Sequence, residues 1–243
     1  MAKPTLLKHL ASLYVQRRLR RTFLDVRLLH GERLSLALEQ GPVLIACNHV
    51  CWWDAFLLVQ LSRALRIDGY CLMDQANLAE LPFFSWVGAI PLRRTSHRAA
   101  HADLKTAALL LNQPRRALVI FPHGAQRPAH LPLEFKSGVA TLARLSNAKV
   151  LPLSLRYDFA DGPRPIVHLC VGNPMSHENA SPRRLVEAIE QQVSSGLAAV
   201  DGLLLERISA PSILLPRTLV LTHERIPWAA RWLRWCLRER GAS

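Results

Sequence analysis

The sequence predicts an α/β fold in which a mainly parallel sheet is flanked by helices. From about residue 42 to residue 197, strand-like apolar runs alternate with longer segments of helical periodicity. This alternation is typical of parallel sheets, because each helix returns the chain to the same end of the sheet. Half of the 243 residues are hydrophobic, so the chain is long and apolar enough to form a substantial core in one domain.

Each element is predicted from its local pattern, in chain order. The first 30 residues contain one or two expected helices in which arginines interleave with leucines, at residues 6–30. Short apolar runs predict strands at residues 42–47, 69–73, 89–92, 117–121, 150–156 and 166–171. Longer periodic segments predict helices at residues 52–65, 98–111, 138–145 and 182–197, while residues 78–87 are helical or irregular.

These elements divide the chain into three parts. Residues 1–40 are expected to form basic amphipathic helices, and residues 41–200 the α/β domain. Residues 201–243 form a C-terminal extension that we expect to belong to the same globular unit. Near its end Trp228, Trp232 and Trp235 share one helical face beside several arginines. Such a helix either anchors the protein at a membrane interface or packs its tryptophans on the domain, and the pattern fits both.

The net charge and the cysteine pattern restrict the possible partners and the cellular compartment. Thirty-one Lys and Arg against eighteen Asp and Glu give a net charge of +13. This charge favours an anionic membrane surface or a nucleic acid as partner, although it is also compatible with a role in solubility alone. The five cysteines are scattered, which indicates a reducing compartment and no metal site. We find no signal peptide and no spanning segment, and therefore expect a cytoplasmic protein peripherally bound to the inner face of the membrane.

One histidine and one aspartate give the strongest indication of catalysis. His49 and Asp54 follow the apolar run at residues 42–47 and lie five residues apart. Five residues place two side chains roughly 140° apart on one helix, and on opposite faces of one strand. The two therefore meet only across a turn, with His49 in the loop and Asp54 in the first turn of the next helix. A carboxylate that orients a histidine in this way makes it a general base.

Three later segments carry groups suited to an anion. Arg93 and Arg94 follow a short apolar segment, and arginine forks suit phosphate or carboxylate. The loop after the strand at 117–121 contains four further candidate residues, Phe121, Pro122, His123 and Gly124, and Arg127 follows them. Lys136 stands just before the helix at 138–145, where a bound anion would be favoured.

Together and in this order, these segments resemble the glycerol-3-phosphate and 1-acyl-glycerol-3-phosphate (lysophosphatidate) acyltransferase family. The HxxxxD motif of the family matches His49 and Asp54. The remaining matches are Gly88, Ile90, Pro91 and Arg94 in the GxIPxxR-type block, Phe121, Pro122 and Gly124 in the FPEGTR block, and Phe135, Lys136 and Gly138 in the FKxG block. The resemblance covers roughly residues 40 to 195, and four ordered blocks are far more specific than one short motif.

The resemblance implies transfer of a fatty acyl group from acyl-CoA or acyl carrier protein to a hydroxyl of a lysophospholipid or related lipid. In this interpretation His49 deprotonates the hydroxyl, Asp54 orients His49, and no cofactor is needed beyond the thioester co-substrate. The implied substrate-binding residues are Arg93, Arg94, Phe121, Pro122, His123, Gly124, Arg127 and Lys136. The chain departs from the family where His123, Ala125 and Gln126 replace Glu, Thr and Arg, so a glycolipid or an isoprenoid-derived alcohol is also open as acceptor.

Three alternatives remain at this stage. Cys51 is a rival nucleophile, since a nearby histidine can generate a thiolate. A catalytically inactive protein of the same fold that binds lipid or a membrane surface is the second. The third is a nucleic-acid binder; because the chain has no recognised nucleic-acid module, we expect no nucleic acid as partner.

Overall fold

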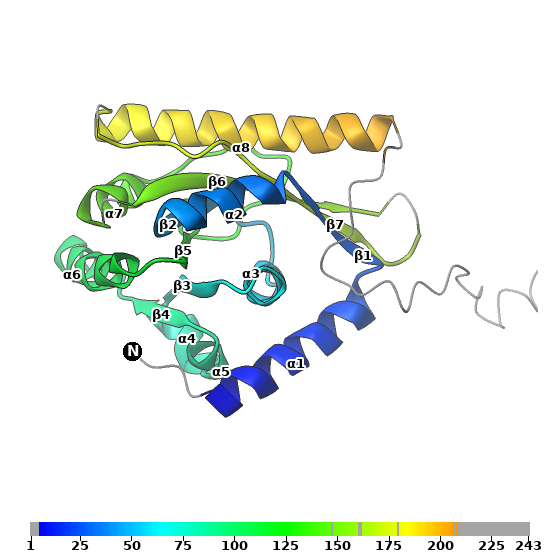
Figure 1. Ribbon diagram of the computed structural model, residues 1–243, viewed down its shortest axis with the longest axis horizontal. Helices are drawn as coiled ribbons and strands as arrows, with labels where there is room; N and C mark the ends of the chain where they lie inside the picture. The colour runs from blue at the N-terminus through cyan, green and yellow to red at the C-terminus, as the bar shows by residue number, and fades with distance from the viewer. Residues whose placement is uncertain (1–4, 147, 160–161, 179, 207, 209–243) are drawn as a thin grey trace, which may run out of the picture.

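The computed structural model describes residues 5–146, 148–159, 162–178, 180–206 and 208. In this part of the chain seven strands form one sheet in the order β1-β7-β6-β2-β5-β3-β4 (Figure 1). Neighbouring strands are parallel except β6 and β7, which are antiparallel. The predicted α/β class with a mainly parallel sheet is therefore confirmed.

The elements follow the predicted order closely. The strands are β1 (Asp25–Leu29), β2 (Val43–Cys47), β3 (Asp68–Asp74), β4 (Ala89–Leu92), β5 (Arg116–Ile120), β6 (Lys149–Asp158) and β7 (Ile166–Val171). The helices are α1 (Thr5–Thr22), α2 (Gly31–Gln40), α3 (Asp54–Ala64), α4 (Gln75–Glu80), α5 (Phe83–Trp86), α6 (His97–Ala108), α7 (Gly138–Ser146) and α8 (Pro182–Leu205), with a 3-10 turn, η1 (Leu109–Asn112), after α6.

The prediction of helix over residues 6–30 is wrong for its last part. Residues 25–29 form β1, which pairs in parallel with β7 and places Val26 opposite Val167. Val26 and Leu28 are buried by this pairing, so tertiary contacts rather than local periodicity fix the extended conformation. A five-residue strand between two helices carries too short a pattern to be recognised from its own sequence.

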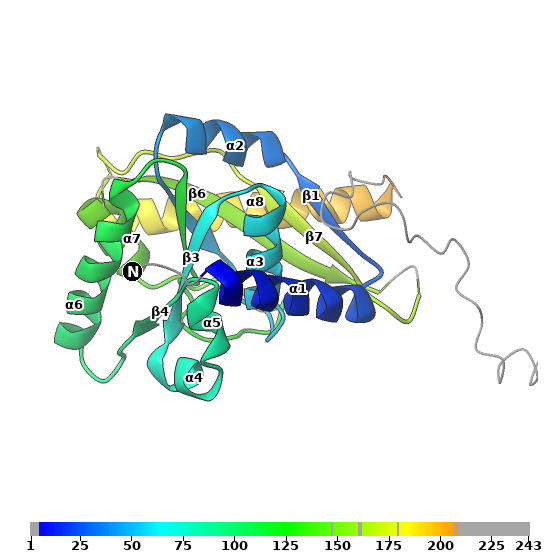
Figure 2. The ribbon, with the colours of Figure 1, turned by 60° about the horizontal axis from the view of Figure 1, so that its bottom comes forward.

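Helices cover both faces of the sheet. Val43 and Ile45 of β2 point to the face covered by α1, α2 and α3, whereas Leu44 points to the face covered by α6, α7 and α8. Figure 2 shows α1 lying across α3 and α5, and the contacts between these helices agree with that view. β2 is a central strand, because it pairs with β5 on one side and β6 on the other. Both of its faces are apolar and covered by helices.

The order of the parallel strands places four loops at one edge of the sheet. β2, β5, β3 and β4 are adjacent and run in the same direction, so their carboxyl ends lie side by side. His49, Phe121, Asp74 and Arg94 stand at or just after these four ends. Crevices at the carboxyl edge of a parallel sheet are the usual ligand sites of α/β folds.

Two expectations concern the ends of the chain. The tryptophan and arginine segment at residues 228–240 lies outside the described residues, and the three-part division of the chain stays a prediction. Among the helices that the structure describes, none has both the length and the apolar composition that crossing a membrane requires.

Candidate active site

His49 and Asp54 meet across the turn between β2 and α3. Nδ1 of His49 lies 2.7 Å from Oδ2 of Asp54, which is the first residue of α3. The Asp54 side chain is fully buried, whereas 19% of the His49 side chain is exposed. With its Nδ1 proton held by the carboxylate, His49 keeps Nε2 free to take a proton from a bound hydroxyl.

The carboxylate of Asp54 is fixed by its own turn. The backbone N–H groups of Val50 and Cys51 donate to Oδ2 over 2.6 Å and 3.1 Å. The N-terminus of α3 adds a favourable dipole for a negative charge at this position. These donors explain the five-residue spacing, because the turn must curl back over the first residue of the helix.

Two neighbours hold the histidine loop in place. Asn48 is buried; its side chain donates to the carbonyl of Leu155 over 2.9 Å and accepts from the N–H of Leu155 over 2.8 Å. The ring of Phe121 stacks on the imidazole of His49, with 4.2 Å between centroids and 20° between planes. These contacts hold the imidazole of His49 beside the carboxylate of Asp54.

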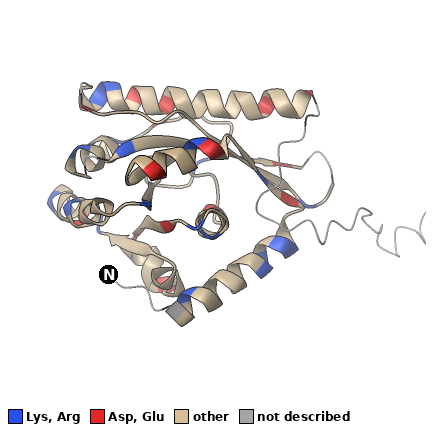
Figure 3. Ribbon diagram, in the orientation of Figure 1, with Lys and Arg blue, Asp and Glu red and all other residues tan. Residues whose placement is uncertain are grey.

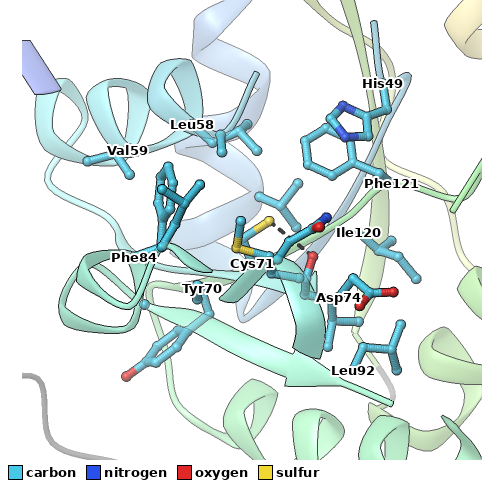
Figure 4. A pocket seen from close by; sticks show the side chains of 18 of the residues that line it. His49, Leu58, Val59, Tyr70, Cys71, Asp74, Phe84, Leu92, Ile120 and Phe121 are labelled. Carbon is cyan, nitrogen blue, oxygen red and sulfur yellow. Dashed lines mark hydrogen bonds between the residues drawn. The ribbon is translucent and has the colours of Figure 1, made fainter. Parts of the chain in front are cut away.

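A cavity of about 680 Å³ opens beside His49. Figure 4 shows His49 and Phe121 together on one side of it, with Leu58, Val59 and Phe84 on another. The apolar part of its wall comes from α3, β3, α5 and their connections, and includes Leu58, Val59, Leu72, Leu81, Phe84 and Val87. The polar part includes Asp74, Asn77, Arg94 and Gln126. The volume is in the range of small-molecule sites, and the wall suits a ligand with a long apolar part and a polar end.

Two cations converge at the glycine of the β5 loop. Arg94 donates to the carbonyl of Gly124, and its guanidinium lies 3.8 Å from Asp74. Gly124 has a φ of 72°, and a Cβ built there would lie 3.3 Å from Nζ of Lys136 and 3.4 Å from Nη2 of Arg94. The glycine thus lets both cations approach the backbone, which makes this corner of the site suited to an anion.

The structure does not bring the other two predicted arginines into the cavity wall. Arg93 pairs with Asp103 of α6 over 2.6 Å and does not line the cavity. Its hydrogen bond keeps the pKa of that carboxyl below its ordinary value. Arg127 pairs with Glu134 over 2.5 Å, while its backbone N–H donates to the carbonyl of His49 over 2.9 Å. Arg127 therefore ties the β5 loop to the histidine loop through its backbone.

Pro122 and His123 of the β5 loop do not line the cavity. His123 is only 6% exposed and sets its ring against Phe135, with 4.7 Å between centroids. Neither ring nitrogen has a hydrogen-bond partner among the described residues. Burial, together with the charges of Arg127 and His49, lowers the pKa of His123 to about 4, so the ring is neutral at pH 7. The carbonyl of Pro122 accepts from the N–H of Lys136 over 3.0 Å.

The geometry speaks against Cys51 as the nucleophile. Its thiol points at Oδ1 of Asp54, with Sγ 3.6 Å from that oxygen. Burial and the negative charge of Asp54 raise the pKa of this thiol, which therefore stays protonated. Within the described ranges, no group of three or more His, Cys, Asp or Glu side chains is placed to hold a metal ion.

Sequence reasoning missed two residues that support the site. Tyr157 of β6 donates its hydroxyl to Oδ1 of Asp54 over 2.6 Å. Asn48 anchors the histidine loop to the same strand. Tyr157 is 103 positions from Asp54, so no spacing argument connects the two. Asn48 directly precedes His49, which is the only local signal that either residue offers.

A comparison with known protein families places the chain in one of them. A family model described as Acyltransferase matches residues 27–156, more than half of the chain. The chain therefore belongs to the acyltransferase family, and the protein is an acyltransferase enzyme.

One solved structure shares the fold over most of both chains. It is the crystal structure of the 1-acyl-sn-glycerophosphate (LPA) acyltransferase, PlsC, from Thermotoga maritima. The two are 18% identical and superpose with a TM-score of 0.61, covering 80% of this chain and 79% of that chain. A comparison with curated protein sequences found no match.

Proposed function

We propose that the protein transfers a fatty acyl group from acyl-CoA or acyl carrier protein to a hydroxyl of a lysophospholipid or a related lipid. The observation that carries this proposal is the 2.7 Å contact between His49 and buried Asp54 at the wall of the apolar cavity. The name of the structural neighbour, an acyltransferase for 1-acyl-sn-glycerophosphate, supports the choice of acceptor class.

In the proposed mechanism His49 acts as general base. Nε2 takes the proton of the acceptor hydroxyl as the oxygen attacks the thioester carbonyl, and Asp54 supports the imidazolium that forms. The tetrahedral intermediate then expels the thiolate, which takes the proton back from His49 and leaves as the free thiol. The new ester bond replaces the thioester bond, and the histidine returns to its starting state without an acyl-enzyme.

The apolar wall and the cationic corner of the site suit different parts of the two substrates. Its apolar wall suits the hydrocarbon of the acyl chain, since burying each methylene contributes roughly 0.8 kcal/mol. Arg94 and Lys136 at Gly124 suit a phosphate on the acceptor. The neutral ring of His123 stands where the family has a carboxylate, and it leaves this corner more positive than a glutamate would.

Helix α1 supports the proposal of a membrane surface as partner. Its solvent side exposes Leu6, Leu10, Leu13 and Tyr14 in the N-terminal half. Arginines occupy the C-terminal half, and the helix has no acidic residue (Figure 3). An apolar stripe beside cations suits the boundary between acyl chains and anionic headgroups. A protein that takes its acceptor from a membrane gains by lying on that surface.

The test of the proposed function is the substitution His49→Ala, assayed with lysophospholipid and either thioester donor. We expect the rate of product formation to fall about 1,000-fold, within the range of general-base contributions. The readout combines release of free thiol with mass spectrometry of the acylated lipid. His101→Ala, at an exposed histidine of α6, is the matched control and should retain the wild-type rate. A wild-type protein that binds lipid but acylates no acceptor with either donor would instead identify the inactive lipid-binding alternative.

A further inference from the structure

The buried carboxylate of Asp54 has a donor that comes from outside its own turn. Tyr157, near the end of β6, donates its hydroxyl to Oδ1 over 2.6 Å. The tyrosine ring packs against Phe23, with 5.8 Å between centroids, and Phe23 in turn sets its edge against Trp53. The hydroxyl is therefore aimed at Asp54 by packing that involves β6, the end of α1 and the residue before α3.

The two carboxylate oxygens of Asp54 have different hydrogen-bond partners. Oδ2 receives His49 and the two backbone N–H groups of the turn. Among the described residues, Oδ1 receives the hydroxyl of Tyr157 and, besides it, only the weak thiol donor of Cys51 at 3.6 Å. A buried carboxylate oxygen without a good donor is costly, and rotation of the carboxylate would exchange the oxygens. Tyr157 thus supplies the strong hydrogen bond that fixes this rotation.

We propose that Tyr157 is a positioning residue for acyl transfer, which holds Asp54 so that its other oxygen keeps His49 oriented as the base. This inference rests on the proposed role of His49. Tyr157 itself touches no reacting atom: its hydroxyl is bonded to Asp54, and it does not line the cavity. Its effect reaches the chemistry only through the carboxylate.

The phenol is suited to this role because it stays a donor. Burial raises the pKa of Tyr157, and the negative charge of Asp54 raises it further, so the hydroxyl keeps its proton throughout the working pH range. By donating to Oδ1, it spreads the negative charge of the carboxylate and leaves Oδ2 facing His49. The other titratable or charged groups near the pair are Cys47 of β2, Cys51 of the turn, His123 and Arg127 of the β5 loop, and Arg18 of α1, whose guanidinium lies over Trp53.

The variant Tyr157→Phe tests the proposal because it removes only the hydroxyl and keeps the ring against Phe23. We expect kcat to fall about tenfold, as for loss of a hydrogen bond to a charged group, with KM for both substrates unchanged. This split between kcat and KM is the readout, because the tyrosine does not line the cavity that would hold the substrates. Ser195→Ala, which removes an exposed hydroxyl that bonds within α8, should change none of these values.

The Asp54→Asn background decides between positioning and a purely structural role, because a loss of folded protein would lower kcat by the same factor with or without the carboxylate. An unchanged kcat in Tyr157→Phe alone, or a rise in KM in place of the fall in kcat, overturns the proposal. In an Asp54→Asn background, Tyr157→Phe should lower kcat less than about twofold, because the two changes act on one interaction. A full tenfold loss in that background would also overturn it. If His49→Ala retains activity, the proposed function itself fails. This result is distinct from an unchanged kcat in Tyr157→Phe, which overturns only the positioning role.

Discussion

At the scale of single residues, the site is built from groups whose surroundings decide their chemistry. His49 and His123 are both histidines of loops at the same sheet edge, yet they have opposite surroundings. His49 faces a buried carboxylate and keeps part of its ring exposed to the cavity. His123 is buried against Phe135 with a pKa lowered to about 4. Residue type alone does not distinguish a histidine that faces a carboxylate and a cavity from one that packs in the interior.

Gly124 provides a prediction at this scale. Gly124→Ala places a Cβ 3.3 Å from Lys136 and 3.4 Å from Arg94, on a backbone with a φ of 72° that disfavours a side chain. Both cations must shift, so we expect KM for a phosphate-bearing acceptor to rise about tenfold, as for a weakened charge-assisted hydrogen bond. Steady-state kinetics with the acceptor varied measures this change. Gly202→Ala on α8, where a Cβ would meet nothing within 4 Å, is the control. An unchanged KM would remove Arg94 and Lys136 from the acceptor site.

At the scale of elements, parallel strands do most of the positioning. β2, β5, β3 and β4 end at one edge, and this arrangement brings together residues from three separate motifs, His49, Phe121 and Arg94, with Asp74 of β3. β6 also supports the site, because Tyr157 near its end donates to the carboxylate of Asp54 and the backbone of Leu155 binds Asn48. The turn before α3 then supplies the local hydrogen bonds. Strand order therefore determines which motifs can act together.

Helix α1 gives the prediction that belongs to this scale. Leu10→Glu places a charge in the exposed apolar stripe, and we expect binding to vesicles of phosphatidylglycerol and phosphatidylcholine to weaken about tenfold, the loss expected for one buried leucine. Vesicle sedimentation measures the binding. Leu36→Glu on α2 is a matched control, since the two leucines are 53% and 55% exposed. Equal losses in both variants would show that added negative charge, rather than the stripe, weakens the binding.

At the scale of the whole molecule, burial of His123 links stability to pH. The pKa of His123 is about 4 in the folded protein, against an ordinary value of 6.5. Between these values the unfolded chain binds a proton that the folded protein does not, so this contribution to stability is complete above 6.5 and declines as the pH falls towards 4. From pH 8 to pH 5 it amounts to about 2 kcal/mol of the free energy of unfolding.

The variant His123→Leu checks this link. We expect its free energy of unfolding, measured by urea denaturation, to fall less than that of the wild type between pH 8 and pH 5. His101→Leu, at an exposed histidine, should keep the wild-type dependence. The same pH dependence in His123→Leu as in the wild type would contradict a neutral, buried His123.

The sequence by itself determined the α/β class, most strand and helix positions and the pairing of His49 with Asp54. These features are local: an apolar run, a helical period and a five-residue turn all lie within one short segment. The order of four motifs along the chain also indicates the acyltransferase family. Strand β1 was missed, because its extended form depends on pairing with β7.

Only the tertiary structure decided which of the candidate residues share one site. In the folded protein Arg93 pairs with Asp103 and Arg127 with Glu134. Arg94 and Lys136 come together at Gly124. The tertiary structure also placed the hydroxyl of Tyr157 on Asp54 across 103 positions of sequence. The physical reason is that a side chain has several possible partners within its reach, and the packing of distant strands selects one. Local sequence therefore defines the pair of His49 and Asp54, while long-range packing defines what holds the two side chains and what they face.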